Sequence, residues 1–354
     1  SIVPVYDIMG NFAGSSANEM GNAANPVAIL YRDRNNNGKY ARVFGNVYGE
    51  ITFMEGLTFR SLLGYNWGQW NYNGYGLPNF EHSEPSKINS HTRDSNYSLQ
   101  WNFTNTLSYN TTIADIHKIS VVLGTEAIDN FYQSLNASRT QYFSEDPQYM
   151  QLDSGEGEKQ NSGSVSEWSL FSQFGRVNYD LMSKYFLEAT VRRDGSSRFS
   201  KDNRYGIFPA ASAAWALSQE NFMAGASNWV DLLKLRVGWG VSGNDQIGNY
   251  NPFTTYRTHV HQASYDLNGE NTKVVSGFIP GALGNENVTW ETTRTLNFGL
   301  DGTLWDNSVS FSFDVWDRMT SDMLFRDPIP TVLGIATAPF INIGEMKTRG
   351  VDIE

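Results

Sequence analysis

The amino-acid sequence predicts an all-β fold, a transmembrane antiparallel up-and-down β-barrel. Three observations predict it. Large apolar side chains alternate with polar ones in many segments, and the connections between those segments alternate between short and long. No apolar run approaches the ~20 residues that a membrane helix needs, so this chain would cross a membrane with strands. Aromatic residues at 14% and charged residues at only 18% agree with this interpretation.

The clearest alternation lies in residues 96–110. The large apolar side chains share one parity and uncharged polar side chains share the other, which places the two sets on opposite faces of one strand. Aromatic rings near both ends of the apolar face suit the two interfaces of a bilayer. We therefore expect Leu99 to face lipid and Gln100 to face a wet lumen. Taken alone, the segment also fits a strand of a soluble sandwich.

The segments around that strand alternate in the same way. Residues 1–39 are rich in Gly, Asn, Ser and Ala and are expected to be mostly loop. Residues 40–54 and 57–70 flank a Glu55-Gly56 turn, which predicts a hairpin. After the strand described above, a short link leads to a further predicted strand, residues 119–128.

The rest of the chain predicts seven more strands. The first of them changes parity at Leu170 and Phe171, as a β-bulge would. The link 218–230 is the least strand-like of the short connections and is expected to hold one helical turn. The seven predicted strands are residues 167–179, 185–193, 207–217, 233–241, 290–304, 309–315 and 349–354.

The lengths of the connections predict which end of the sheet faces outward. Outer-membrane barrels have short periplasmic turns and long extracellular loops. We therefore interpret the long polar stretches as extracellular loops. These stretches are residues 71–95, 131–165, 195–206, 242–289 and 326–346. A count of about eleven strands is odd, and because natural single-chain barrels have an even count, we expect an incomplete barrel.

Composition excludes some classes of function. A formal net charge of −11 argues against a nucleic-acid partner, which requires a basic footprint, and fits a surface facing divalent cations or neutral ligands. Without cysteines neither disulfides nor thiolate metal sites form. The first residues carry no signal peptide, so we expect either a mature N-terminus or a piece of a larger protein.

One glycine motif has a nucleotide-binding alternative. Gly238, Gly240 and Gly243 form a GxGxxG pattern after an apolar run. A dinucleotide site needs a helix to follow, because the helix N-terminus holds the pyrophosphate, and the following residues do not predict one. We interpret the glycines as small residues on the luminal face of a strand.

No cofactor or metal ion is predicted, although a surface calcium ion is an alternative. Residues 33–38 resemble the first half of a calcium loop but lack its twelfth ligand. His259 and His261 have no third ligand at a suitable spacing, and the acidic residues between 145 and 158 have no fixed geometry. Because the sequence contains no catalytic motif, we do not expect an enzyme.

A set of motifs carries a resemblance to a known family. The set begins with Asp194, Gly195, Ser196, Ser197, Arg198 and Phe199. It continues through residues 204–210, 242–250 (including Gly243 and Asn244), 290–291, 297–301, 342–344 and 350–351. Together these closely resemble the barrel of SusC/RagA-type TonB-dependent outer-membrane transporters. We expect the motif residues to form loops and turns, with Gly195 and Gly243 in backbone conformations that other residues resist.

The resemblance implies a 22-stranded barrel in the outer membrane of a Gram-negative bacterium. It implies an N-terminal plug, a SusD-like surface lipoprotein as a lid, and energy supplied through TonB. The substrates it implies are oligosaccharides or peptides. Because this sequence lacks the plug, the TonB-contacting segment and several of the strands that the resemblance implies, we expect residues 1–354 to be a partial barrel domain. A passive porin-like channel and a surface adhesin or structural barrel are the alternatives.

Aromatic side chains in two predicted loops are candidate contacts for the lid or the substrate. Rings in ordered loops commonly anchor partners or stack on ligands. The alternative is that they pack onto their own loop and the barrel rim. The candidates are Trp70, Tyr72, Tyr75 and Phe80 in the first loop and Tyr250, Phe253, Tyr256, Tyr265 and Phe278 in the longest one. Outer-membrane lipid and lipopolysaccharide complete the expected partners.

Overall fold

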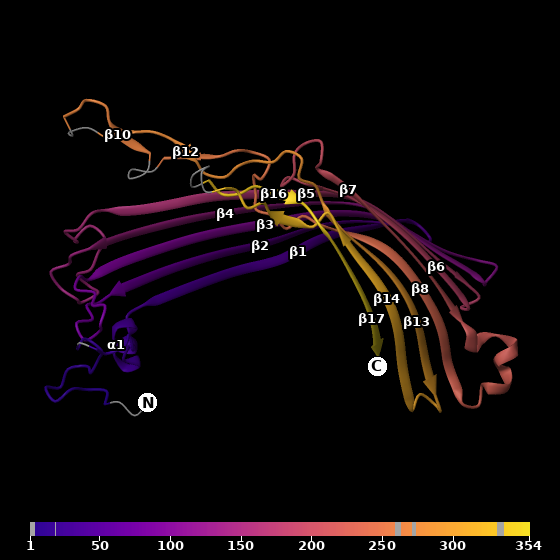
Figure 1. Ribbon diagram of the computed structural model, residues 1–354. Helices are drawn as coiled ribbons and strands as arrows, with labels where there is room; N and C mark the ends of the chain where they lie inside the picture. Colours follow the sequence, from indigo (N-terminus) through magenta and orange to yellow (C-terminus); the bar gives the residue numbers. More distant parts are fainter. Residues whose placement is uncertain (1–3, 18, 259–262, 271–273, 331–335) are drawn as a thin grey trace. The chain divides into compact units, whose positions relative to one another are not determined.

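The computed structural model describes residues 4–17, 19–258, 263–270, 274–330 and 336–354. Eleven strands form one antiparallel sheet in chain order, so the predicted all-β fold and strand count are confirmed (Figure 1). The strands are β1 (Asn37–Met54), β2 (Leu57–Gly76), β3 (Ser90–Ile113), β4 (His117–Thr140), β5 (Gln160–Leu181), β6 (Tyr185–Ser196), β7 (Tyr205–Ala216), β8 (Val230–Asn244), β13 (Glu291–Leu304), β14 (Val309–Ser321) and β17 (Glu345–Ile353).

Short elements fill some of the connections. The described residues contain one α-helix and two 3-10 helices: α1 (Pro26–Asp33), η1 (Leu217–Gln219) and η2 (Asn221–Ala226). No helix in the described parts of the chain is long and apolar enough to cross a membrane. Small two-stranded ladders join β9 (Tyr256–Arg257) to β12 (Ile279–Pro280), β10 (Ser264–Asp266) to β11 (Val274–Ser276), and β15 (Leu324–Arg326) to β16 (Phe340–Asn342).

The predicted alternation of short and long connections is present from β1 to β6 and from β8 to β17, but it fails between β6 and β8, where residues 197–204 form the shorter connection and residues 217–229 the longer one. Residues 55–56, 114–116, 182–184 and 305–308 are tight turns, whereas 77–89, 141–159, 245–290 and 322–344 are long connections. The tight turns contain residues with positive φ, the backbone conformation that matches the twist of paired strands. Residues 217–229 hold the two 3-10 helices where one helical turn was predicted.

Several predicted boundaries were wrong. The polar stretches 71–95 and 131–165 are partly strand, because β2 to β5 extend well past their alternating apolar segments. Residues 1–39 contain α1, although Asn25 and Pro26 are recognisable helix-start residues. The ladder between β5 and β6 shows no bulge at Leu170, since these strands pair without a register shift from Leu170 to Leu181.

The chain divides into two compact units, which are described separately. Unit 1 comprises Ser1–Gly45, Tyr65–Trp101 and Asn130–Glu167. It contains α1, one end of each of the strands β1 to β5, and the connections 77–89 and 141–159. Unit 2 comprises Asn46–Gly64, Asn102–Asp129 and Trp168–Glu354 and contains the rest of β1 to β5 and all the later strands.

In unit 2 the strand register separates an apolar face from a polar face. One cross-strand row is apolar throughout: Tyr179, Leu187, Ala213, Val237, Phe298, Val315 and Val351. The adjacent row, on the opposite face, contains Asn178, Glu188, Ser212, Gly238, Asn297, Trp316 and Gly350. We call the first the outer face and the second the luminal face. Such alternation is the pattern of a sheet with lipid on one side and water on the other.

Candidate functional site

The motif residues lie together where β6 ends and where β8 ends. The expectation that they form loops and turns was wrong for Asp194, Gly195 and Ser196, which end β6, and for Gly243 and Asn244, which end β8. The Ser196 hydroxyl donates to Asp245 Oδ2 at 2.7 Å. Arg198 forms an ion pair with Asp245 at 3.4 Å and donates through Nε to Asn249 Oδ1 at 3.1 Å. The Arg198 guanidinium also lies 4.8 Å from the centre of the Trp168 ring. These contacts tie residues 197–204 to residues 245–249, so the two segments hold each other in place.

An apolar cluster stabilises the same junction. Phe199 is only 1% exposed and packs on Trp290, with ring centroids 5.2 Å apart. Phe208, Ile247 and Val288 complete the buried cluster, and Leu170 packs against it. This explains the parity change that the sequence shows at Leu170. A luminal-face position carries an apolar side chain there because this cluster covers it.

The motif glycines are required for space. Gly195 and Gly243 have no positive φ, so the expected backbone explanation was wrong. A Cβ atom on Gly195 would lie 2.4 Å from the Tyr205 ring, and one on Gly243 would lie 2.1 Å from the Phe208 ring. Any side chain at either position would therefore displace an aromatic ring.

The other motif residues hold neighbouring strands. Asp194 forms an ion pair with Arg192 at 2.6 Å. The Ser197 hydroxyl accepts from the backbone N–H of Ser169 at 2.8 Å, and Asn244 donates to Glu291 at 3.1 Å. Gly238 and Gly240 lie inside β8, and residues 245–250 contain no helix. The geometry for a dinucleotide site is therefore missing.

Ion pairs across strands form a second feature of the luminal face. Arg236 on β8 contacts Asp301 at 2.7 Å and Asp314 at 3.0 Å. Arg192 on β6 contacts Glu126 at 2.8 Å and donates to the buried Ser172 hydroxyl at 2.8 Å. Each arginine bridges several strands, so these networks brace the luminal wall. Sequence reasoning missed them because strand register decides which charges meet.

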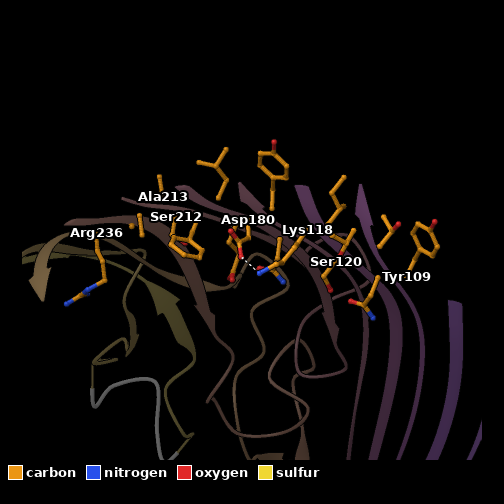
Figure 2. Close-up of a pocket in the computed structure, with 18 of the residues that line it drawn as sticks. Tyr109, Lys118, Ser120, Asp180, Ser212, Ala213 and Arg236 are labelled. Carbon is orange, nitrogen blue, oxygen red and sulfur yellow. Dashed lines mark ion pairs between the residues drawn. The ribbon is translucent and has the colours of Figure 1, made fainter. Parts of the chain in front are cut away.

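A cavity of about 1230 Å³ lies among β3 to β8 and β13 in unit 2. Lys118, Ser120, Asp180, Ser212 and Arg236 are among its lining residues. Figure 2 shows Lys118, Asp180 and Arg236 directed to one side of the sheet, with the Lys118–Asp180 ion pair at 3.5 Å. Polar groups from several strands thus present hydrogen-bonding capacity to a hydrated solute or to another folded segment.

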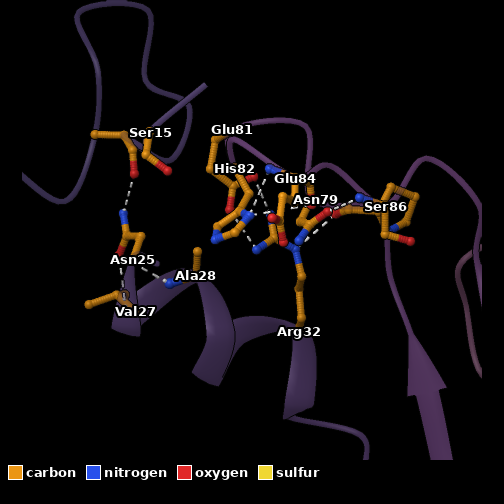
Figure 3. Close-up of polar contacts among 12 residues, drawn as sticks. Ser15, Asn25, Val27, Ala28, Arg32, Asn79, Glu81, His82, Glu84 and Ser86 are labelled. Carbon is orange, nitrogen blue, oxygen red and sulfur yellow. Dashed lines mark hydrogen bonds and ion pairs between the residues drawn. The ribbon is translucent and has the colours of Figure 1, made fainter. Parts of the chain in front are cut away.

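In unit 1 a polar clamp holds the segment before β1 against the connection 77–89. Arg32 on α1 donates twice to the Glu81 carboxylate, at 2.7 and 2.6 Å, and its Nε donates to the Pro78 carbonyl at 2.8 Å (Figure 3). Asn25 caps α1 and also donates to the carbonyls of Val5 and Ala13. The clamp therefore fixes residues that the sequence indicated only as loop.

The clamp should weaken in acid. Burial raises the pKa of the Glu81 carboxyl, but the hydrogen bonds and charge of Arg32 lower it more, so its pKa lies below the ordinary 4.5. A depressed pKa stabilises the folded form above the ordinary value, and that contribution is lost as pH falls through the depressed one. We expect residues 4–36 of the full-length protein to become protease-sensitive as the pH falls below 4.5, the ordinary pKa of a glutamate. Glu81→Gln should abolish this pH step and Glu84→Gln should keep it; an identical step in both variants would refute the role of Glu81.

The first group of predicted aromatic contacts divides between two environments. Trp70 lies against Gly38 of β1, and Tyr72 lies against Gly74. Tyr75 instead stacks on the fully buried His91, with ring centroids 4.7 Å apart. Phe80 is exposed in the connection that follows β2. Tyr75 is thus engaged internally, whereas Trp70, Tyr72 and Phe80 remain candidates for contact.

The second group lies in the connection between β8 and β13. Its five rings are all exposed, from 46% at Tyr250 to 75% at Tyr265. Tyr250 and Phe253 precede the small ladders, Tyr256 and Tyr265 lie in β9 and β10, and Phe278 directly precedes β12. Rings packed onto their own loop would be covered, so this exposure favours contact with a partner or ligand. The alternation of apolar residues did not reveal these ladders because they are only two or three residues long.

The metal alternatives gain no support from the described residues. Asp33 is the last residue of α1 and accepts a hydrogen bond from Asn36 at 2.9 Å, and Asn37 begins β1. His259 and His261 lie outside the described residues. Within the part of the chain that the structure describes, no three His, Asp or Glu side chains are grouped to hold a metal ion.

Comparisons with known proteins agree with this geometry. The family "TonB dependent receptor-like, beta-barrel" matches residues 6–354. TonB-dependent receptor P39 of Formosa agariphila is 29% identical over 98% of this chain and 32% of its own length. TonB-dependent receptor SusC of Bacteroides thetaiotaomicron is 37% identical over 52% of this chain and 18% of its own length.

A solved structure extends the likeness to the fold. A chain in the structure of the RagAB peptide transporter matches 99% of this chain with a TM-score of 0.83 and 25% identity. This chain covers 38% of the matched chain, and it spans about a third of the length of P39. The likeness therefore concerns one part of a larger barrel.

Proposed function

The chain belongs to the TonB-dependent receptor family of outer-membrane transporters, and on that premise we propose that the protein containing it actively imports oligosaccharides or peptides, energised through TonB. The observation that carries this proposal is the agreement of nearly the whole eleven-stranded sheet with a chain of the RagAB peptide transporter. Members of the family are transporters and not enzymes.

Residues 1–354 supply one part of the barrel wall in this proposal. The outer face contacts lipid, and the luminal face lines the route of the solute. The ion-pair networks around Arg192 and Arg236 join neighbouring strands and stabilise that wall. A stable wall would keep its shape when a separate plug domain moves inside the barrel. A 22-stranded barrel with an N-terminal plug accommodates this segment as about half of its strands.

A SusD-like surface lipoprotein is the proposed partner on the extracellular side. The β8–β13 connection presents exposed Phe253, Tyr256 and Phe278. Large exposed aromatic side chains are typical of the anchors that dominate protein interfaces. Co-purification of the full-length protein with its lipoprotein should fail when residues 250–256 are replaced by a Gly/Ser linker.

Energy dependence tests the proposal. Cells that express the full-length protein should take up labelled oligosaccharide or peptide, and deletion of TonB or addition of a protonophore should abolish that uptake. A passive channel predicts uptake that continues without TonB. A structural or adhesive barrel predicts no uptake in either condition.

A further inference from the structure

The luminal side of β1 and β2 in unit 1 carries three aromatic rings that lie against glycines. A Cβ atom on Gly38 would lie 2.4 Å from the Trp70 ring, and one on Gly74 would lie 2.6 Å from the Tyr72 ring. The Tyr40 hydroxyl lies 3.2 Å from the Cβ position of Gly68. Glycine at these positions leaves the space that the rings occupy. We call Tyr40, Trp70 and Tyr72 the aromatic platform.

The platform belongs to the polar face of these strands. Asn66, Gly68, Trp70 and Tyr72 share one parity of β2, and the Cβ position of Gly68 lies 2.8 Å from the hydroxyl of Ser98. Trp67 has the opposite parity and packs on Tyr97, with ring centroids 6.4 Å apart. Trp67 therefore belongs to the outer face, and Trp70, three residues further along, belongs to the luminal face.

The platform rings are accessible. Trp70 is 38% exposed although β2 has a neighbouring strand on each side. Side chains two residues apart on a strand stand about 7 Å apart, so Trp70 and Tyr72 form consecutive contact points along the strand. An elongated ligand moving parallel to β2 would meet both in turn.

Hydrogen-bonding groups without a charge partner border the rings. Arg42 donates through Nε to Asn66 Oδ1 at 2.8 Å. Within the described residues Arg42 forms no ion pair, unlike Arg192 and Arg236 in unit 2. Its remaining N–H groups can therefore donate to a ligand without first breaking a salt bridge.

These features match the chemistry of a carbohydrate. One face of a pyranose ring presents C–H groups that pack on an aromatic side chain, and its rim of hydroxyls exchanges hydrogen bonds with amide and guanidinium groups. Extended peptides are commonly bound by pairing with a free strand edge, which β2 lacks because it lies between β1 and β3. We propose that the aromatic platform is a glycan-binding site on the luminal wall, an inference that rests on the proposed transport function.

Matched tryptophan variants of the full-length protein test this site. The probes are maltohexaose, cellohexaose, xylohexaose and mannohexaose. A tryptic peptide pool represents the alternative class of substrate. We expect at least one oligosaccharide to bind. Trp70→Ala should raise its Kd about tenfold or more, whereas Trp70→Phe should stay within about threefold because a ring is retained. Trp67→Ala on the outer face should leave the Kd unchanged.

Each outcome separates this inference from the transport proposal. Loss of glycan binding in Trp70→Ala with retention in Trp67→Ala supports the site. Failure of all four oligosaccharides to bind, or equal binding by Trp70→Ala and the unmodified protein, overturns it. TonB-dependent uptake of the peptide pool alone would keep the transport proposal and overturn the glycan site. Absence of any TonB-dependent uptake would remove the transport proposal itself.

Discussion

Phe298→Arg should cost about 2–4 kcal/mol of folding free energy in lipid, the penalty of a basic side chain near the bilayer midplane. Phe298 lies in the apolar row between Val237 and Val315 and is 55% exposed on the outer face. An arginine there would be surrounded by hydrocarbon. We therefore expect a lower denaturant midpoint for the full-length variant refolded in phospholipid vesicles.

The adjacent residue provides the matched control. Asn297 pairs with Gly238 and Trp316 on the luminal face, where an arginine stays in water. Asn297→Arg should therefore change the folding free energy by less than about 1 kcal/mol. Equal losses in the two variants, or a greater loss for Asn297→Arg, would mean that the two faces have been assigned the wrong way round.

Phe199→Ala should cost about 3–5 kcal/mol, the usual penalty for removing a large aromatic side chain from a packed core. Phe199 is almost fully buried and packs on Trp290 within the cluster beneath the motif network. Loss of the ring would leave a cavity under residues 197–204 and 245–249. We expect faster proteolysis of these segments and a lower unfolding midpoint in the full-length protein.

Phe253→Ala is the control for the same residue type outside the cluster. Phe253 is largely exposed in the β8–β13 connection, so its removal should change stability by no more than about 0.5 kcal/mol. If Phe199→Ala were as stable as Phe253→Ala, the motif residues would not hold the two segments together.

Sequence alternation was sufficient to predict the sheet and its two faces. Residues 96–110 show why: every large apolar side chain in this part of β3 has the parity of Leu99, and none has the parity of Gln100, so the two lie on opposite faces of the strand. The same rule predicted strands that are shorter than those in the structure. At the ends of β2 and β4 polar side chains occupy both faces, so the signal that marks a strand in lipid disappears while the backbone pairing continues.

The site was harder to predict because its contacts depend on register. Ser196 and Arg198 were recognised as part of a motif, but their partner Asp245 lies far along the chain. The bridges from Arg236 to Asp301 and Asp314 likewise depend on which residues β8, β13 and β14 place side by side. Period-two alternation assigns a face to each residue without assigning its cross-strand neighbour.

The orientation of the sheet in the membrane tests the central claim most directly. An epitope inserted after Asn268, in the long β8–β13 connection, should be labelled by antibody on intact cells that express the full-length protein. The same epitope inserted after Asp306, in the tight turn between β13 and β14, should be labelled only after the outer membrane is permeabilised. Labelling of the Asp306 insertion on intact cells, with the Asn268 insertion protected, would contradict the assignment of long connections to the cell surface.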